Sequence, residues 1–265
     1  MRIARFSTST VPSQFGIIEG DSIQPLDGCP LKAIKKTGSP LPLAKVKLLT
    51  PVAPPNLIAI GRNYLEHAKE GNDVAPKAPI VFIKATTTIV GPGDSIVIPE
   101  MAPNEVDYEA ELAVVIGTTA RNVSEADALK HVFGYTCAND VSARDCQRND
   151  PQWARGKSFD TFAPIGPWIE TELSPANLRV QLILNGNVMQ SESSSMMIFN
   201  VPYLISYLSK CMTLLPGTVI LTGTPAGCGF ARKPPVWLKP GDDVVVEIEG
   251  IGSLRNPVKS AASAR

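Results

Sequence analysis

The chain has 265 residues, enough for one large domain or for one domain with a small appendage. Its 25 basic and 25 acidic side chains cancel, which argues against a global field that would attract nucleic acid or an anionic membrane. The longest apolar runs are as long as strands and fall short of the about 20 residues that cross a bilayer.

Histidine and cysteine counts limit the metal chemistry. The two histidines, His67 and His131, argue against a zinc site built from two or three histidines, so a metal here would take oxygen ligands, as magnesium, manganese and calcium do. Five cysteines without a CxxC pair indicate reduced thiols in a cytoplasmic protein. Arg2 and Arg5 precede a Ser/Thr run and leave mitochondrial import open.

Residues 1 to about 50 are short apolar runs broken by Gly, Pro and Ser, which predicts a small β-rich N-terminal domain over 1–52. Prolines at 51, 54 and 55 predict a hinge. The run 56–61 then reads as a buried strand. Asn63 and Glu66 have the spacing of a capping box, which predicts a helix that begins here and carries His67 and Glu70 on one face.

Strands dominate the rest of the chain. We expect them at 80–83, 95–98, 106–116, 180–184, 219–221 and 244–248, with a hairpin turn at Asn185-Gly186. Helical stretches are expected at 124–132, where Ser124 can cap, and at 201–211. The pattern predicts an α+β fold that is mostly β, with a main domain over 53–259 and a tail over 260–265.

The segment 106–116 holds the densest group of acidic residues. Because side chains alternate along a strand, Asp107, Glu109 and Glu111 share one face, and the opposite face is apolar. Three neighbouring carboxylates repel one another, and a divalent cation relieves that repulsion. A solvated strand face is the alternative. Asp140 also follows a predicted strand, where an ordinary turn would explain it equally well.

These segments together resemble the fumarylacetoacetate hydrolase family. The resemblance runs in order through Ile60-Gly61-Arg62-Asn63-Tyr64 with His67 and Glu70, then 107–112, 139–145, 156–160, 222–225 and 241–252. It implies a mixed β-roll, a β-sandwich of the family's C-terminal domain type behind a small N-terminal domain, and a homodimer. It also implies Mg²⁺ or Mn²⁺ bound by Glu109, Glu111 and Asp140.

The resemblance further implies roles for six other side chains. His67 and Glu70 would form a catalytic dyad on a lid around 64–78, with Lys157 as a catalytic cation. Arg144, Gln147 and Thr224 would face the substrate, with Thr224 in a glycine-rich loop. A phosphate-loop role for Lys157 fails because the required glycine is replaced by Pro151, whereas a surface lysine remains an alternative. Asp107 is expected to support a ligand or to face solvent.

The leading hypothesis is Mg²⁺- or Mn²⁺-dependent hydrolysis or decarboxylation of a small β-diketo or β-keto acid, such as an acylpyruvate, a fumarylacetoacetate-like compound or oxaloacetate. A cation on the carbonyl oxygen would stabilise the enolate left by carbon–carbon cleavage. One alternative is an isomerase or tautomerase of an enol-keto acid, which can rely on Lys157 and the metal without His67. The other is a non-catalytic calcium-binding β-domain. No nucleic-acid or membrane partner is expected.

Overall fold

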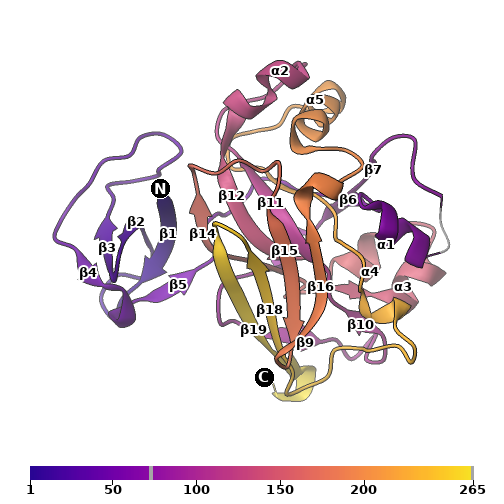
Figure 1. The fold of residues 1–265 in the computed structure, drawn as a ribbon. Helices are drawn as coiled ribbons and strands as arrows, with labels where there is room; N and C mark the ends of the chain where they lie inside the picture. The colour runs from indigo at the N-terminus through magenta and orange to yellow at the C-terminus, as the bar shows by residue number, and fades with distance from the viewer. Residues whose placement is uncertain (72–73, 264–265) are drawn as a thin grey trace.

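Two large β-sheets form the main body of the protein (Figure 1). The computed structural model describes residues 1–71 and 74–263. Positions 72–73 of the expected lid and 264–265 of the expected tail lie outside the described residues. The N-terminal strands lie on one side of the molecule (Figure 1). Three short helices lie on the other side: α1 (Leu65–Glu70), α3 (Arg144–Asn149) and α4 (Ala154–Lys157).

The larger sheet has a mixed strand order. Its main path is β4 (Leu41–Pro42), β3 (Ser22–Pro25), β2 (Gln14–Glu19), β1 (Arg2–Ser7), β14 (Ala163–Glu170), β12 (Val132–Asn139), β11 (Ala110–Ile116), β17 (Val219–Leu221), β6 (Leu57–Gly61) and β7 (Ile80–Lys84). Off this path, β5 (Lys47–Leu49) pairs with β1 and β8 (Ile89–Val90) with β14. Because β1 pairs antiparallel with β14, backbone hydrogen bonds join the N-terminal strands to the main sheet. We propose that the boundary between the N-terminal domain and the main domain lies between residues 52 and 53.

The second sheet covers one face of the first. Its order is β16 (Asn187–Ser193), β15 (Arg179–Leu184), β18 (Asp243–Ile248), β19 (Gly252–Ser260) and β9 (Ile96–Ile98). A small ladder pairs β10 (Val106–Asp107) with β13 (Ser142–Ala143). The helices are α1 (Leu65–Glu70), α2 (Glu125–Ala128), α3 (Arg144–Asn149), α4 (Ala154–Lys157) and α5 (Val201–Cys211). The expected α+β, mostly β fold class is confirmed, and none of the described helices is long and apolar enough to span a membrane.

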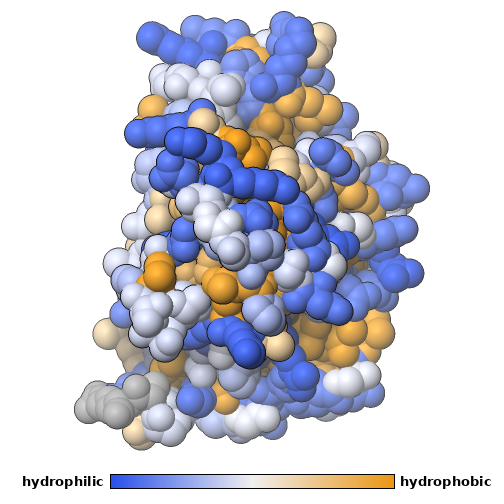
Figure 2. All heavy atoms as spheres, turned by 90° about the vertical axis from the view of Figure 1, so that its left-hand side faces the viewer, coloured by the Kyte–Doolittle hydropathy of each residue, from blue (hydrophilic) through white to orange (hydrophobic). Residues whose placement is uncertain are grey.

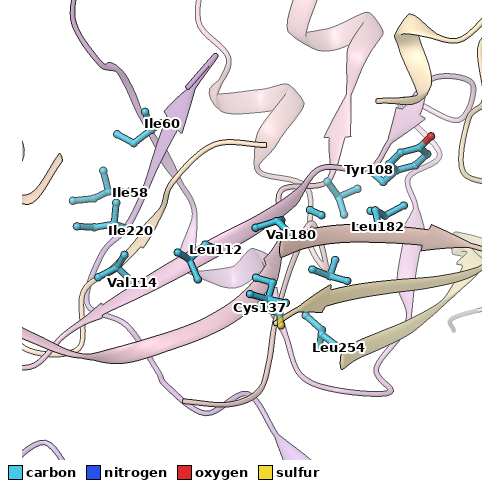
Figure 3. Packing of buried hydrophobic residues seen from close by; sticks show 14 of the residues in the cluster. Ile58, Ile60, Tyr108, Leu112, Val114, Cys137, Val180, Leu182, Ile220 and Leu254 are labelled. Atoms are coloured by element: carbon cyan, nitrogen blue, oxygen red, sulfur yellow. The ribbon is translucent and has the colours of Figure 1, made fainter. Parts of the chain in front are cut away.

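The two faces of β11 bury different apolar clusters. Leu112 and Val114 pack in the core between the sheets, where Figure 3 shows them near Ile220 and Val180. Ala113 and Val115 belong to a second cluster on the other face, which includes residues of the N-terminal segment. Both faces of the central sheet are therefore closed to water, so an acid on either face enters a low-dielectric interior.

The outer surface of the N-terminal side is mixed. Figure 2 looks onto the side that lies at the left of Figure 1, and hydrophilic (blue) and apolar (orange) groups are interspersed there. Mixed coverage is usual for protein surface, because polar atoms alone cannot cover it.

Several expected elements agree closely with the structure. The helix over 201–211 and the strand over 219–221 have the expected bounds, and Asn185-Gly186 makes the hairpin turn with both residues at positive φ, 51° and 81°. Ser124 accepts a hydrogen bond from the amide of Asp127 and so caps α2. That helix is shorter than expected, because the chain continues from Leu129 as a 3₁₀ turn.

The expected continuous strand over 106–116 was wrong, because β10 ends at Asp107 and β11 begins at Ala110. The Asp107 carboxylate accepts the amide proton of Tyr108, and the amide of Glu109 donates to the Asn139 side chain. Side-chain hydrogen bonds thus replace the ladder at this break.

The expected capping box was also wrong. Tyr64 occupies the N-cap of α1 and makes no side-chain cap. The fully buried Asn63 amide donates to the carbonyls of Thr222 (2.7 Å) and Phe199 (2.9 Å), and its oxygen accepts from the Phe199 amide. Tertiary partners therefore outcompete the local cap and fix the start of α1.

Asn63→Ala removes the partner of three backbone groups at once, one buried at Thr222 and two partly buried at Phe199, so we expect the free energy of unfolding to fall by about 3 kcal/mol. Urea unfolding followed by circular dichroism measures this change. Asn187→Ala, at an exposed strand position, is the matched control and should change stability by less than about 0.5 kcal/mol. Equal midpoints for the two variants would contradict the anchoring role of Asn63.

Candidate active site

The pairing of β11 with β12 brings together the three carboxylates expected to bind metal. Ala110 lies opposite Asn139, and the amide of Asp140 donates to the carbonyl of Glu109 at 2.9 Å. Glu109, Glu111 and Asp140 each offer one oxygen, and these oxygens lie within 4.8 Å of one another. All three side chains are buried, so the solvated-face alternative is wrong for them.

Three buried cations surround two of these acids. The Lys157 ammonium donates to Glu109 and to Asp140, both at 2.8 Å, and Lys84 donates to Asp140 at 2.5 Å. Arg144 pairs with Glu109 at 2.7 Å. Burial alone would raise the pKa of Glu109, but Lys157 and Arg144 outweigh it and hold that pKa well below its usual range. Lys157 is therefore a buried, ion-paired ammonium, and the surface-lysine alternative is wrong.

Glu111 lies in a different electrostatic environment. The Gly223 amide donates to one of its oxygens at 2.6 Å. Burial raises the pKa of Glu111 well above its usual value, and the negative charges of Asp140 and Glu109 raise it further. A divalent cation relieves this repulsion, and an all-oxygen donor set suits hard cations. The residues therefore fit a metal, and the buried acidic cluster is a candidate metal site.

Asp107 supports the site from behind. It is fully buried and accepts hydrogen bonds from the amides of Gly229 (2.8 Å) and Phe230 (3.1 Å). It also accepts from the Arg144 side chain at 2.9 Å. The expectation that Asp107 might face solvent was wrong, whereas its supporting position next to the acidic cluster agrees with the other expectation.

Arg144 lines the cleft and keeps one hydrogen-bond donor nitrogen without a partner among the described residues. Its Nη1 donates to Gln147 at 2.9 Å, so the expected one-turn spacing in α3 does bring these two side chains together. Among the described residues its buried Nη2 has no hydrogen-bond partner. A guanidinium with a free N–H in a buried cleft suits a carboxylate ligand.

A cleft of about 510 Å³ joins these groups. Of the nine residues expected in the site, eight line it; Asp140 is buried beneath. The lining comprises Ile60, Gly61, Arg62, His67, Glu70, Gly71, Phe82, Glu109, Glu111, Arg144, Gln147, Arg148, Trp153, Lys157, Thr224 and Phe230. Trp153 also forms part of the cleft wall.

His67 and Glu70 meet on α1, as their spacing predicts. His67 Nδ1 lies 3.4 Å from Glu70 Oε2, and the Gly227 amide holds Glu70 Oε1 at 2.7 Å. His131 lies elsewhere, on the 3₁₀ turn after α2, 3.1 Å from the Thr118 hydroxyl. Of the two histidines, only His67 lines the cleft.

The glycine-rich loop after β17 binds the protein's own carboxylates through its amides. Gly223, Gly227 and Gly229 donate to Glu111, Glu70 and Asp107. Gly227 has a φ of +106°, and a Cβ there would lie 2.1 Å from a neighbouring carbonyl oxygen, so a side chain cannot be accommodated. The amides of these three glycines are therefore occupied by the protein's own carboxylates and are not free to hold a substrate carboxylate.

The Thr224 hydroxyl lies in the cleft wall but is already hydrogen-bonded. It donates to the Ala110 carbonyl at 2.9 Å and accepts from Gln190 at 2.7 Å. Gln190 also accepts the Ala110 amide at 2.9 Å. Sequence reasoning missed Gln190, which lies in a strand without a motif, and Lys84, whose position at the end of an apolar strand was the only signal.

Comparison with known proteins agrees with this architecture. The family model described as fumarylacetoacetate (FAA) hydrolase C-terminal matches residues 56–259, and the one described as Rv2993c-like, N-terminal matches residues 1–51. These matches confirm the expected β-roll fold type and the expected family.

Two curated relatives and one solved structure are similar over most of the chain. The fumarylacetoacetate hydrolase domain-containing protein 2 homolog of Dictyostelium discoideum is 51% identical over 83% of this chain and 76% of its own. The mitochondrial oxaloacetate tautomerase fahd2 of Xenopus laevis is 43% identical over 97% and 90%. A 2-hydroxyhepta-2,4-diene-1,7-dioate isomerase from Mycobacterium marinum superposes with a TM-score of 0.89 at 41% identity, over 98% and 99%.

Binding of Mn²⁺ should weaken as the pH falls, because a proton competes for Glu111, whose raised pKa makes that competition begin at higher pH than for an ordinary glutamate. Calorimetry in buffers of different ionisation enthalpy measures the protons released. Glu111→Gln should bind Mn²⁺ at least about tenfold more weakly and lose the proton release. Glu105→Gln, which alters the exposed ion pair of Glu105 with Arg148, is the control and should leave both the affinity and the proton release unchanged. Unchanged affinity in Glu111→Gln would exclude this carboxylate as a ligand.

Proposed function

Because this chain belongs to the fumarylacetoacetate hydrolase family, we propose that it is a metal-dependent tautomerase that interconverts the keto and enol forms of a small oxo acid of the oxaloacetate class. The observation that carries the proposal is the meeting of an acidic cluster, an open Arg144 donor and His67 around one cleft. The relatives named as tautomerase and isomerase favour this reaction over the hydrolysis or decarboxylation that the sequence placed first.

We propose Mg²⁺ or Mn²⁺ as the cation, with Glu109, Glu111 and Asp140 as its protein ligands. When bound, the cation stabilises the negative charge that develops on the substrate oxygen during enolisation. With three protein carboxylates as ligands, the cation would keep positions at which substrate and water could bind. An oxygen-only ligand set supports these hard cations over softer metals.

Cationic side chains are proposed to hold the substrate. Arg144 has one open N–H group for a substrate carboxylate, and Gln147 fixes its orientation from the same helix. Lys157 adds a positive charge next to the acidic cluster, where it can stabilise an enolate. Thr224 is proposed to contact the substrate through the free lone pair of its hydroxyl.

His67 is the group we propose to move the proton. Enolisation removes a proton from the carbon beside the carbonyl and places a proton on the carbonyl oxygen, so no water is consumed. Burial alone lowers the pKa of Lys157, but Asp140 and Glu109 raise it further than that, so Lys157 stays charged and is a poor base. For this reason we do not propose a tautomerase that relies on Lys157 and the metal without His67. His67 is an imidazole oriented by Glu70 at the cleft wall, the usual arrangement for a general base.

Carbon–carbon hydrolysis or decarboxylation remains the second candidate, because the His67–Glu70 pair in the cleft is also suited to activating water. Tautomerisation and these cleavage reactions each pass through an enolate on the same atoms of the substrate. The non-catalytic calcium-binding alternative was wrong, because the chain is an enzyme of this family.

We propose a homodimer, which sedimentation equilibrium tests directly, with a small keto acid as ligand and no nucleic-acid or membrane partner. We propose a cytoplasmic location. The frog relative is named as mitochondrial, which supports mitochondrial import as the alternative, and fractionation of the source cells distinguishes the two.

In the first functional test, the purified protein with Mg²⁺ or Mn²⁺ should accelerate the decay of enol-oxaloacetate, followed by the ultraviolet absorbance of the enol. Chelator should abolish the acceleration, and Glu109→Ala should lose it, because the cation stabilises the enolate. Mass spectrometry should find oxaloacetate conserved. Full activity in Glu109→Ala would refute the metal role, and stoichiometric pyruvate or carbon dioxide would favour the second candidate.

In the second functional test, His67→Gln should lower kcat about a hundredfold or more with little change in KM, because general-base catalysis contributes at least that factor. His131→Gln is the matched control, since it alters the other histidine outside the cleft, and should leave kcat unchanged. Deuterium incorporation at the carbon beside the carbonyl measures the proton-transfer step. Equal exchange rates for the two variants would remove His67 from the mechanism.

A further inference from the structure

A second group of possible metal ligands lies beside the acidic cluster and includes a sulfur. His67, Glu70 and Cys228 each offer one ligand atom, and these three atoms lie within 4.8 Å of one another. The Nδ1–Oε2 distance is 3.4 Å and the Sγ–Nδ1 distance is 3.7 Å. The first is long for a charge-assisted hydrogen bond, which is usually about 2.8 Å. Both distances are also compatible with ligand atoms that surround a shared ion.

The distances match those between ligands of one tetrahedral zinc ion. Zinc bonds of about 2.0 Å to nitrogen or oxygen and about 2.3 Å to sulfur place N and O ligands about 3.3 Å apart. They place N and S ligands about 3.5 Å apart. The observed Nδ1–Oε2 distance of 3.4 Å and Sγ–Nδ1 distance of 3.7 Å need only small adjustments to reach these values.

Surrounding groups already orient the three side chains. The Gly227 amide holds Glu70 Oε1 at 2.7 Å and leaves Oε2 directed at the histidine. The Gln190 amide nitrogen lies 3.5 Å from Cys228 Sγ. Such supporting contacts are typical of metal sites, where they fix the ligands. His67 and Glu70 line the cleft, so a fourth, solvent ligand can reach the ion from there.

We propose that His67, Glu70 and Cys228 form a second cation site, selective for Zn²⁺ and similar soft ions, and that its occupancy inhibits the enzyme. The Cys228 thiol releases its proton to solvent when the sulfur binds the ion. A thiolate and an imidazole prefer such ions, whereas the all-oxygen cluster suits Mg²⁺ and Mn²⁺. The two sites are therefore distinguished by ligand chemistry.

Inhibition follows from the bonding of the imidazole. Once Nδ1 of His67 binds the ion, the neutral ring carries its proton on Nε2 and has no lone pair left to accept another. Glu70 binds the same ion at the same time. This consequence rests on the proposed function of His67, whereas the existence of the site does not.

Cobalt(II) tests the site without an activity assay. With excess Mg²⁺ present to fill the acidic cluster, Co²⁺ should produce the near-ultraviolet thiolate-to-cobalt charge-transfer absorption, and Zn²⁺ should abolish it by displacement. Cys228→Ala should lack the band. Cys211→Ser, which alters an exposed cysteine, is the matched control and should keep it.

A second variant guards against misfolding of Cys228→Ala. Glu70→Gln keeps the thiol, so its band should appear but require at least about tenfold more Co²⁺. No band in the wild-type protein, or an equal band in Cys228→Ala, would overturn the site.

Inhibition is tested separately under saturating Mg²⁺. One equivalent of Zn²⁺ should abolish enol-oxaloacetate turnover, and Cys228→Ala should keep its Mg²⁺-dependent activity and need at least about tenfold more Zn²⁺. Equal zinc sensitivity of wild type and variant would overturn the inhibitory role. A cobalt band in a protein without tautomerase activity would refute the proposed function and leave the site supported.

Discussion

The site depends on one constraint, the burial of three carboxylates where β11 and β12 pair. Glu109 and Asp140 are compensated by direct ion pairs with Lys84, Lys157 and Arg144. Removing one partner from such a buried network costs several kcal/mol, because the other charge stays desolvated. The network is thus poorly suited as a source of stability and well suited to holding charges in place for a cation and an anionic substrate.

The loop after β17 connects this network to the dyad on α1. Through three backbone amides it holds Glu111, Glu70 and Asp107, which belong to the acidic cluster, the dyad and the support of Arg144. A backbone shift in this loop would therefore move all three functional groups together. A side chain at any of the three glycines would clash with neighbouring atoms. The loop thus connects the central sheet to α1 through its backbone amides.

The local pattern predicted a good part of this arrangement. Alternation along a strand placed Glu111 beside the buried Ala113 and Val115, and helical spacing paired His67 with Glu70. Asp140 and Lys157 required the resemblance to a family, because their contacts join segments far apart in sequence. Lys84 was missed for the same reason. The capping box failed because a short motif records only local options, and buried Asn63 finds stronger tertiary partners.

The Nδ1 atom of His67 has a place in both proposals, the catalytic base and the second cation site. Its Nδ1 faces Glu70 and Cys228, so the same nitrogen that orients the ring as a base is also the atom a soft cation would bind. A hydroxyl or apolar side chain at position 228 would leave the dyad without a sulfur ligand. In the proposed mechanism, the side chain at position 228 determines whether a metal can bind the base, whereas the acidic cluster and Lys157 stabilise the enolate.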